Sequence, residues 1–256
     1  VIRGPAAASY GANAFLGVIN ILTRADEGGT RAGVMVGAGE RSYRELNARV
    51  GAAGEAGHWR LSVGQRADDY YEADDYGTVA DDLRDQYADG RGDWFINDTD
   101  TLSVMGGVAN TRLDDDIDAG LTYPVKVQSG YGQVVWQRVY ESGAETRLSY
   151  NYTQQSYGDL LDLGGAPLDL GFSTQRQNLT AAWNVSAGPS VRAALGAEYR
   201  MDEVESPFYY NQVEPIRENS WRIYGNGEFR LAPEWLVNAG AMLESTHVGR
   251  REFSPR

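Results

Sequence analysis

The chain has no cysteine, only two histidines and no apolar run long enough for a membrane helix. The lack of cysteine is compatible with an oxidising periplasm or outer membrane. No window approaches 18 consecutive apolar residues, which excludes a transmembrane helix. Transmembrane strands are not excluded, because their apolar residues fall at every second position. Basic residues are also scarce: 23 Lys and Arg against 36 Asp and Glu give a net charge of -13, so no nucleic acid is expected as a partner, since its phosphates require a basic face.

Signals for catalysis are missing as well. The two histidines, His58 and His247, lie at opposite ends of the strand pattern, and no G-x-S-x-G motif occurs. The Gly-Ala-Gly of residues 37–39 lacks the last glycine of the dinucleotide-binding fingerprint. We therefore expect no enzyme.

The chain does contain segments in which polar and apolar residues alternate. Residues 222–231 place polar side chains at every even position and apolar or small ones at every odd position, which is the period of a β-strand with two different faces. The 31 Gly, 16 Tyr and 6 Trp suit a twisted barrel with aromatic girdles. The same alternation predicts eleven strands, at residues 31–38, 43–53, 58–67, 91–97, 101–111, 129–140, 145–155, 174–186, 191–202, 219–231 and 235–247.

Tight turns separate these strands at a regular interval of about 44 residues. They fall at residues 54–57, 97–100, 141–144, 187–190 and 232–235, and longer, acidic, Tyr-rich connections lie between them. Short links at one end and long links at the other are typical of an outer-membrane β-barrel. Alternation alone also fits a soluble β-sandwich or a lipocalin-like barrel with the apolar face inward. Gly- and Ala-rich apolar faces and strands of 10 to 13 residues favour the membrane.

The fold class predicted is therefore an all-β antiparallel transmembrane barrel. Single-chain bacterial barrels have even strand numbers, so an odd count of eleven predicts that the chain is a piece of a larger barrel. The chain starts at Val1 without methionine, and we expect a targeting segment upstream.

The first 24 residues do not read as a barrel strand. They resemble the end of the plug domain of TonB-dependent outer-membrane receptors, with the approximate pattern V-x-R-G-P-x-S-x-x-Y-G-x-N-A-x-x-G-V-I-N-I-x-T-K. Ala7 stands where the family often has Ser, and Arg24 replaces the usual Lys. The matching positions are Val1, Arg3, Gly4, Pro5, Tyr10, Gly11, Asn13, Ala14, Gly17, Val18, Ile19, Asn20, Ile21 and Thr23.

This resemblance implies two domains, the end of a plug at 1–26 and the first half of a 22-stranded barrel at 27–256. It also implies import of a scarce bulky solute, such as an iron-siderophore or cobalamin, across the outer membrane of a Gram-negative bacterium. The implied partners are a TonB-type energy-coupling protein, a small-molecule or metal-chelate ligand and outer-membrane lipid. A passive outer-membrane channel or a surface-binding barrel without energised transport is the alternative, and a soluble calcium-binding β-protein is a more distant one.

The resemblance further implies that Arg3 helps to hold the plug by pairing with carboxylates of the barrel wall. Glu145, Glu198 and Glu228 fall at polar positions of the predicted strands and are the candidate partners. A charged pair in a wet lumen can be broken by pulling, which apolar packing does not allow as readily. The alternative is an arginine that is simply solvated in the lumen.

The long connections offer two further kinds of candidate residue. Aromatic side chains that could form a ligand surface, or equally a girdle at the membrane boundary, are Tyr70, Tyr71, Tyr76, Phe208, Tyr209 and Tyr210. Hard oxygen donors that could bind Ca²⁺, or simply stay hydrated, are Asp68, Asp69, Asp74, Asp75, Asp114 and Asp116. Neither acidic run fits the EF-hand spacing, and no other cofactor is expected.

Overall fold

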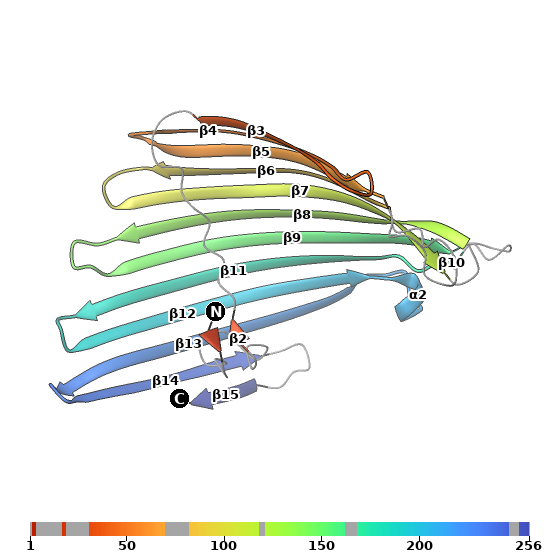
Figure 1. The fold of residues 1–256 in the computed structure, drawn as a ribbon. Coiled ribbons are helices and arrows are strands. Elements are labelled where there is room, and N and C mark those ends of the chain that lie inside the picture. The colour runs from red at the N-terminus through yellow and green to blue at the C-terminus, as the bar shows by residue number, and fades with distance from the viewer. Residues whose placement is uncertain are drawn as a thin grey trace.

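The fold is known from a computed structural model that describes residues 2–3, 17–18, 31–69, 82–117, 121–161, 168–245 and 251–255. Nearly all of this is one curved layer of antiparallel strands (Figure 1). Neighbours in the sheet are neighbours in sequence, in the order β3 to β15, and the two-residue β10 pairs only with β9. The edge strands of the described sheet are β3 and β15.

The strands of this sheet are β3 (Arg31–Ala38), β4 (Arg44–Gly54), β5 (Gly57–Asp68), β6 (Leu83–Phe95), β7 (Asp100–Ile117), β8 (Leu121–Val139), β9 (Glu145–Leu161), β10 (Leu168–Asp169), β11 (Phe172–Ala187), β12 (Val191–Glu205), β13 (Ile216–Ala232), β14 (Trp235–Ser245) and β15 (Arg251–Pro255). A single helical turn, α2 (Pro207–Tyr210), lies between β12 and β13. No helix of the described residues is long and apolar enough to cross a membrane.

All eleven predicted strands are present, and the all-β antiparallel prediction is confirmed. The boundaries of β6 were wrong: the prediction began at residue 91, whereas the strand begins at Leu83. Residues 83–90 carry two aspartates and read as an acidic connection. Asp85 instead accepts a hydrogen bond from Thr111 of β7 at 2.7 Å, so these acids occupy polar-face positions of a paired strand.

The connection between β7 and β8 was also predicted too long. The two strands pair as far as Ile117 and Leu121, and they are 18 and 19 residues long. At about 3.3 Å per residue such a hairpin extends roughly 60 Å, well beyond the ~9–11 residues that cross a bilayer. The acidic residues Asp114 and Asp116, expected in a loop, therefore lie in the outer part of a long hairpin, paired with Pro124 and Thr122 through the backbone.

The five predicted tight turns all lie at one end of the sheet (Figure 1). Their backbone explains some of the residue choices. Gly57 has a φ of 140°, and Gly143 and Gly188 have φ values of 78° and 67°, all in the region that favours glycine. In the turn before β7, Asn97 Oδ1 accepts hydrogen bonds from the backbone N–H groups of Thr99 and Asp100. The opposite end carries α2 and the short turn between β3 and β4.

Side chains divide the sheet into two faces. Paired residues share a face, so the register carries the alternation of each strand across the whole layer. We call the face with Arg222, Asn226 and Glu228 the polar face and the face with Leu195 and Ile223 the apolar face. In β5 and β12 the apolar-face residues are the more exposed ones, as on the convex side of a curved sheet, where side chains diverge.

No apolar core fills the described part of the molecule. The buried hydrophobic residues found there are Val125 and Val135, far apart on β8, Met242 of β14 and Ala144 in the turn before β9. The residues that would fill the centre of a soluble barrel are exposed instead: Trp183 by 44%, Leu195 by 47%, Ile223 by 56% and Phe229 by 37%. This arrangement supports an apolar face that is turned outward and does not fit a soluble barrel with an apolar interior.

Two short strands near the N-terminus form their own antiparallel pair. β1 (Ile2–Arg3) pairs with β2 (Gly17–Val18), with Ile2 opposite Val18 and Arg3 opposite Gly17. The predicted domain boundary between residues 26 and 27 lies outside the described residues and stays a prediction.

Candidate functional site: the polar face of the sheet

The polar face holds most of the charged side chains of the sheet, and many of them are paired across strands. Arg222 of β13 lies directly opposite Glu198 of β12, with Nη2 at 2.6 Å from Oε2. Asp202 sits between Arg176 of β11 at 2.5 Å and Arg200 of its own strand at 2.8 Å. Alternation puts residues i and i+2 on one face, which is why Arg200 and Asp202 meet.

A second cluster surrounds Asp93 of β6, which is only 4% exposed. Its Oδ1 accepts hydrogen bonds from Arg91 Nη2 at 2.9 Å and Ser103 Oγ at 2.5 Å. Its Oδ2 accepts from Arg91 Nε at 2.7 Å and lies 2.8 Å from Nε2 of His58. The register explains the meeting, because His58, Asp93 and Ser103 are opposite one another on β5, β6 and β7. This buried carboxylate thus has four donor contacts from three side chains.

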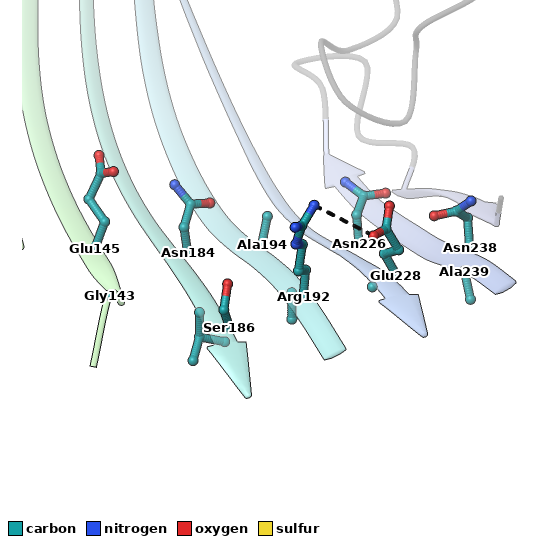
Figure 2. Close-up of a pocket in the computed structure, with 13 residues that line it drawn as sticks. Gly143, Glu145, Asn184, Ser186, Arg192, Ala194, Asn226, Glu228, Asn238 and Ala239 are labelled. Carbon is teal, nitrogen blue, oxygen red and sulfur yellow. Dashed lines mark ion pairs between the residues drawn. The ribbon is translucent and has the colours of Figure 1, made fainter. Parts of the chain in front are cut away.

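An open basin lies on the polar face close to the tight-turn end (Figure 2). It has a volume of about 530 Å³. Its polar side chains come from five neighbouring strands, β9 and β11 to β14, and point to the same side of the sheet. They are Glu145, Asn184, Ser186, Arg192, Asn226, Glu228 and Asn238. Amides and carboxylates in this arrangement can bind a guanidinium or an N–H group, which needs oxygen acceptors.

The three carboxylates predicted to receive Arg3 all lie on the polar face, and the structure separates them. Glu198 is already paired with Arg222. Glu228 has Arg192 beside it at 3.8 Å, a loose contact with an arginine that is 74% exposed (Figure 2). For Glu145, the structure as described places no cation within 4.0 Å, and it lines the basin together with Glu228. The backbone of Arg3 pairs with Gly17 in β1–β2, and where its side chain points is not part of the described structure.

The predicted aromatic surface is partly described. Phe208, Tyr209 and Tyr210 make up most of α2, at the end with the long connections, and all three are exposed. The rings of Phe208 and Tyr209 meet edge to face, 5.2 Å apart. Ser206 fixes this turn: its Oγ accepts a hydrogen bond from the N–H of Tyr209 at 3.4 Å and donates one to the carbonyl of Gly171 at 3.1 Å. The other predicted aromatics, Tyr70, Tyr71 and Tyr76, lie outside the described residues.

Of the predicted calcium ligands, Asp74 and Asp75 also lie outside the described residues. Asp68 ends β5 with Arg66 at 4.0 Å, and the N–H of Asp69 donates to the carbonyl of Arg41 at 2.9 Å. Within the described ranges, no three acidic or histidine side chains come together in a way that could hold a metal ion. The calcium site stays a prediction for the acidic connection as a whole.

A further polar contact closes the short turn between β3 and β4. Tyr43 donates a hydrogen bond to Oε2 of Glu45 at 2.5 Å. This bond to the carboxylate raises the pKa of the Tyr43 hydroxyl above its ordinary value, with smaller contributions from desolvation and the nearby negative charge. The turn is thereby fixed by a side chain that stays protonated.

Sequence reasoning missed the Asp93 cluster and the Asp202 group. The available signal was the recurrence of opposite charges at i and i+2 within a strand, as in Arg91 and Asp93 or Arg200 and Asp202. That pattern marks a strand face on which charges are paired. To predict that His58 and Ser103 also meet Asp93, the register between β5, β6 and β7 would have to be known.

No known protein family and no curated protein matches the chain, whereas solved structures do. The siderophore receptor PirA from Pseudomonas aeruginosa matches with a TM-score of 0.75 at 17% identity, over 99% of this chain and 44% of that one. A ferric enterobactin receptor (PfeA) mutant from the same organism gives 0.76 at 15% identity, over 100% and 45%. The copper transporter OprC gives 0.69 at 14% identity, over 99% and 46%. The chain has the fold of a TonB-dependent receptor barrel.

The chain spans less than half the length of these receptors. In a TonB-dependent receptor barrel the polar face lines the interior, so the basin, the Asp93 cluster and the paired arginines are features of the lumen wall. The tight turns then mark one rim, and α2 with its aromatic side chains marks the other (Figure 1).

Proposed function

We propose that this chain is part of an outer-membrane receptor that imports a metal chelate with energy from a TonB-type protein. The observation that carries the proposal is the division of one open sheet into a convex apolar face and a polar, charge-paired face, with the five predicted tight turns together at one rim. A plugged transporter needs such a wall: lipid outside, and inside a wet surface that holds a removable plug.

Aromatic side chains on the apolar face support insertion in a membrane. Trp94 and Trp136 lie in one register row near the tight turns, through Leu102 between them. Trp136 carries the guanidinium of Arg138 over its ring at 5.5 Å, and Arg138 forms a two-point contact with Asp100. A ring with a charged neighbour at the edge of an apolar band is typical of a membrane boundary.

The names of the solved relatives and the aromatic side chains of α2 support this ligand class. Two of the similar receptors bind or carry iron chelates by their names, and one is a copper transporter. The exposed rings of Phe208, Tyr209 and Tyr210 supply an aromatic, partly polar surface at the outer rim, which suits an aromatic chelator such as enterobactin.

The decisive experiment is uptake of ⁵⁵Fe-enterobactin by cells that express the full-length protein, with and without the energy-coupling protein. We expect binding to persist and uptake to stop when that protein is removed. Uptake that continues unchanged would favour the alternative of a passive channel. A panel of other ferric and cupric chelates, tested in the same cells, separates a wrong ligand from a wrong mechanism.

Plug retention can be tested at the basin. Arg3→Glu should loosen the plug and make cells more sensitive to bulky antibiotics. The variant replaces a guanidinium, which carboxylates of the lumen wall would hold, by a carboxylate that they repel. Glu145→Arg should restore the barrier when combined with Arg3→Glu. Glu198→Arg is the matched control, since Glu198 is already paired with Arg222, and it should give no rescue.

A further inference from the structure

One sector of the described polar face has no charged residue. It is formed by β7, β8 and β9, the yellow and green strands in the middle of the sheet (Figure 1). Within residues 101–113, 125–139 and 149–157, the polar-face positions hold only hydroxyl, amide, small and apolar side chains. We call this sector the uncharged lane. From Ser149 to Tyr157 it runs about 27 Å along β9.

Charged residues lie on the polar face to both sides of the uncharged lane. On one side are residues of β6, namely Asp89, Arg91 and Asp93, and on the other are Arg176 of β11 and Asp202 of β12. The difference is not one of depth, because a single register row crosses all three sectors. This row runs from Asp89 through Gly107, Tyr131 and Thr153 to Arg176 and Asp202.

The outer end of the uncharged lane adjoins α2. The ring of Tyr157, at this end of the lane on β9, stacks on the ring of Phe172 of β11 with 5.1 Å between the centroids. Gly171, directly before Phe172, accepts a hydrogen bond from the hydroxyl of Ser206, the residue that caps α2. At the tight-turn end the lane comes close to Glu145, which lines the basin. The lane therefore connects the aromatic side chains of one rim with the basin near the other.

Side chains in the middle of the uncharged lane are small or able to exchange hydrogen-bond partners. Ser129, Thr153 and Gln155 are exposed, and their hydroxyl and amide groups can both donate and accept. Beside them the ring of Tyr131 lies over Gly107, where a Cβ would be 2.7 Å from Cε1 of the ring. A plug surface that separates from this part of the wall leaves no charge without a partner, because water can replace the lost hydrogen bonds.

The flanking sectors can hold a plug more strongly. Arg176 is 55% exposed although it is paired with Asp202, so its guanidinium can donate further hydrogen bonds. A hydrogen bond to a charged group contributes about 1.5–3 kcal/mol, against about 0.5–1.5 kcal/mol for a neutral one. An interface that is pulled opens first where its contacts are weakest, which here is the uncharged lane.

We propose that the imported solute passes along the uncharged lane, between the plug and the wall formed by β7, β8 and β9. The inference rests on the proposed function, because it requires a plug that is pulled away from the wall. A wall without fixed charge also suits passage of a charged chelate, since conduction requires binding that is weak enough for release.

The test places single cysteines in the full-length protein, in a background without other cysteines, and measures their labelling by a maleimide added outside the cells. Ser129→Cys and Ser149→Cys lie in the uncharged lane. Ser62→Cys of β5 and Ser220→Cys of β13 are the matched controls, because they are polar-face serines of the flanking sectors. Each change replaces one oxygen by sulfur, and uptake by each variant shows that it folds.

The chelate added is ferric enterobactin, or the member of the chelate panel that the uptake assay selects. In cells with the energy-coupling protein, we expect the chelate to raise the labelling rate about five-fold or more at the two lane positions and less than about two-fold at the two controls. Without the energy-coupling protein, the chelate should raise none of the four rates.

An equal rise at all four positions would mean that the plug leaves the wall as a whole, and it would overturn the proposal. A larger rise at Ser62→Cys or Ser220→Cys would place the route on a flanking sector and would also overturn it, as would no rise in cells that take up the chelate. Cells that take up no chelate of the panel would refute the proposed function itself. The two failures are distinguishable because uptake is counted from the radioactive metal, separately from the labelling.

Discussion

Replacing Leu61 by arginine tests which solvent the apolar face meets. Leu61 lies in the middle of β5 on that face, between Trp59 and Val63, and is 53% exposed. It is four residues from Gln65, where the uncharged polar residues of this face begin, opposite Gln86 of β6. This is about 13 Å along a strand, or roughly 10 Å of depth at the usual tilt of such strands. If the apolar face contacts lipid as proposed, Leu61 lies near the middle of a hydrocarbon band about 25 Å thick.

The expected cost differs sharply between the two solvents. A cation at the bilayer midplane on a lipid-facing strand costs about 2–4 kcal/mol. On a water-exposed surface the same change is usually within about 0.5 kcal/mol. We expect Leu61→Arg to lower the free energy of unfolding of the full-length protein in lipid bilayers by about 3 kcal/mol, measured by urea titration with tryptophan fluorescence.

The neighbouring residue provides the control. Ser62 lies on the polar face, opposite Arg49 and Asp89, where an added cation meets one like and one opposite charge. Ser62→Arg should change the free energy of unfolding by less than about 1 kcal/mol. If Leu61→Arg costs no more than Ser62→Arg, the assignment of the apolar face to lipid is wrong.

Two further predictions concern the lumen wall and one tight turn, both read from the midpoint of urea unfolding. Asp93→Asn puts an NH₂ group among four donor contacts and should lower the free energy of unfolding by about 2–3 kcal/mol. Ser103→Ala removes one of these contacts and should lower it by about 1 kcal/mol. Equally small effects of both variants would contradict the stabilising role of the Asp93 cluster. Gly57→Ala should cost about 2–3 kcal/mol, because φ is 140° and a Cβ would lie 2.1 Å from the carbonyl oxygen of Asp93. Gly54→Ala in the same turn meets nothing within 4 Å and should be nearly neutral.

The sequence predicted the parts of the fold that depend on period. Strict alternation located β12 and β13 closely, because one face of each is apolar and the other polar along the whole strand. It failed at β6 and at the outer halves of β7 and β8, where polar residues such as Arg84 and Asp114 fall at positions of the apolar face and break the alternation. Strands that leave the hydrocarbon no longer need an apolar face, so their pairing is maintained by hydrogen bonds and leaves no hydrophobic period to detect.

The candidate site was predictable only in part. The polar-face position of Glu145, Glu198 and Glu228 followed from alternation, which shows that strand period can assign residues to one face of the sheet. Alternation did not predict which of these three carboxylates is already paired with an arginine. That depends on the register between β12 and β13, which puts Arg222 opposite Glu198. Register is a property of two strands, and one sequence read strand by strand contains no direct signal for it.

Charge placement connects the two faces and explains why average hydropathy misreads such a chain. On the polar face, acids and arginines are close to balanced and meet in pairs, so the wall stays hydrated without a strong net field. On the apolar face of the described strands, charges lie where the band ends, as Arg138 with Asp100 at the tight-turn rim and as Arg84 and Arg112 near the other. Arginine thus has two roles, which depend on its position in the sheet. On the polar face it pairs with a carboxylate, and at the edge of the band, under the proposed function, it marks the depth to which the barrel enters lipid.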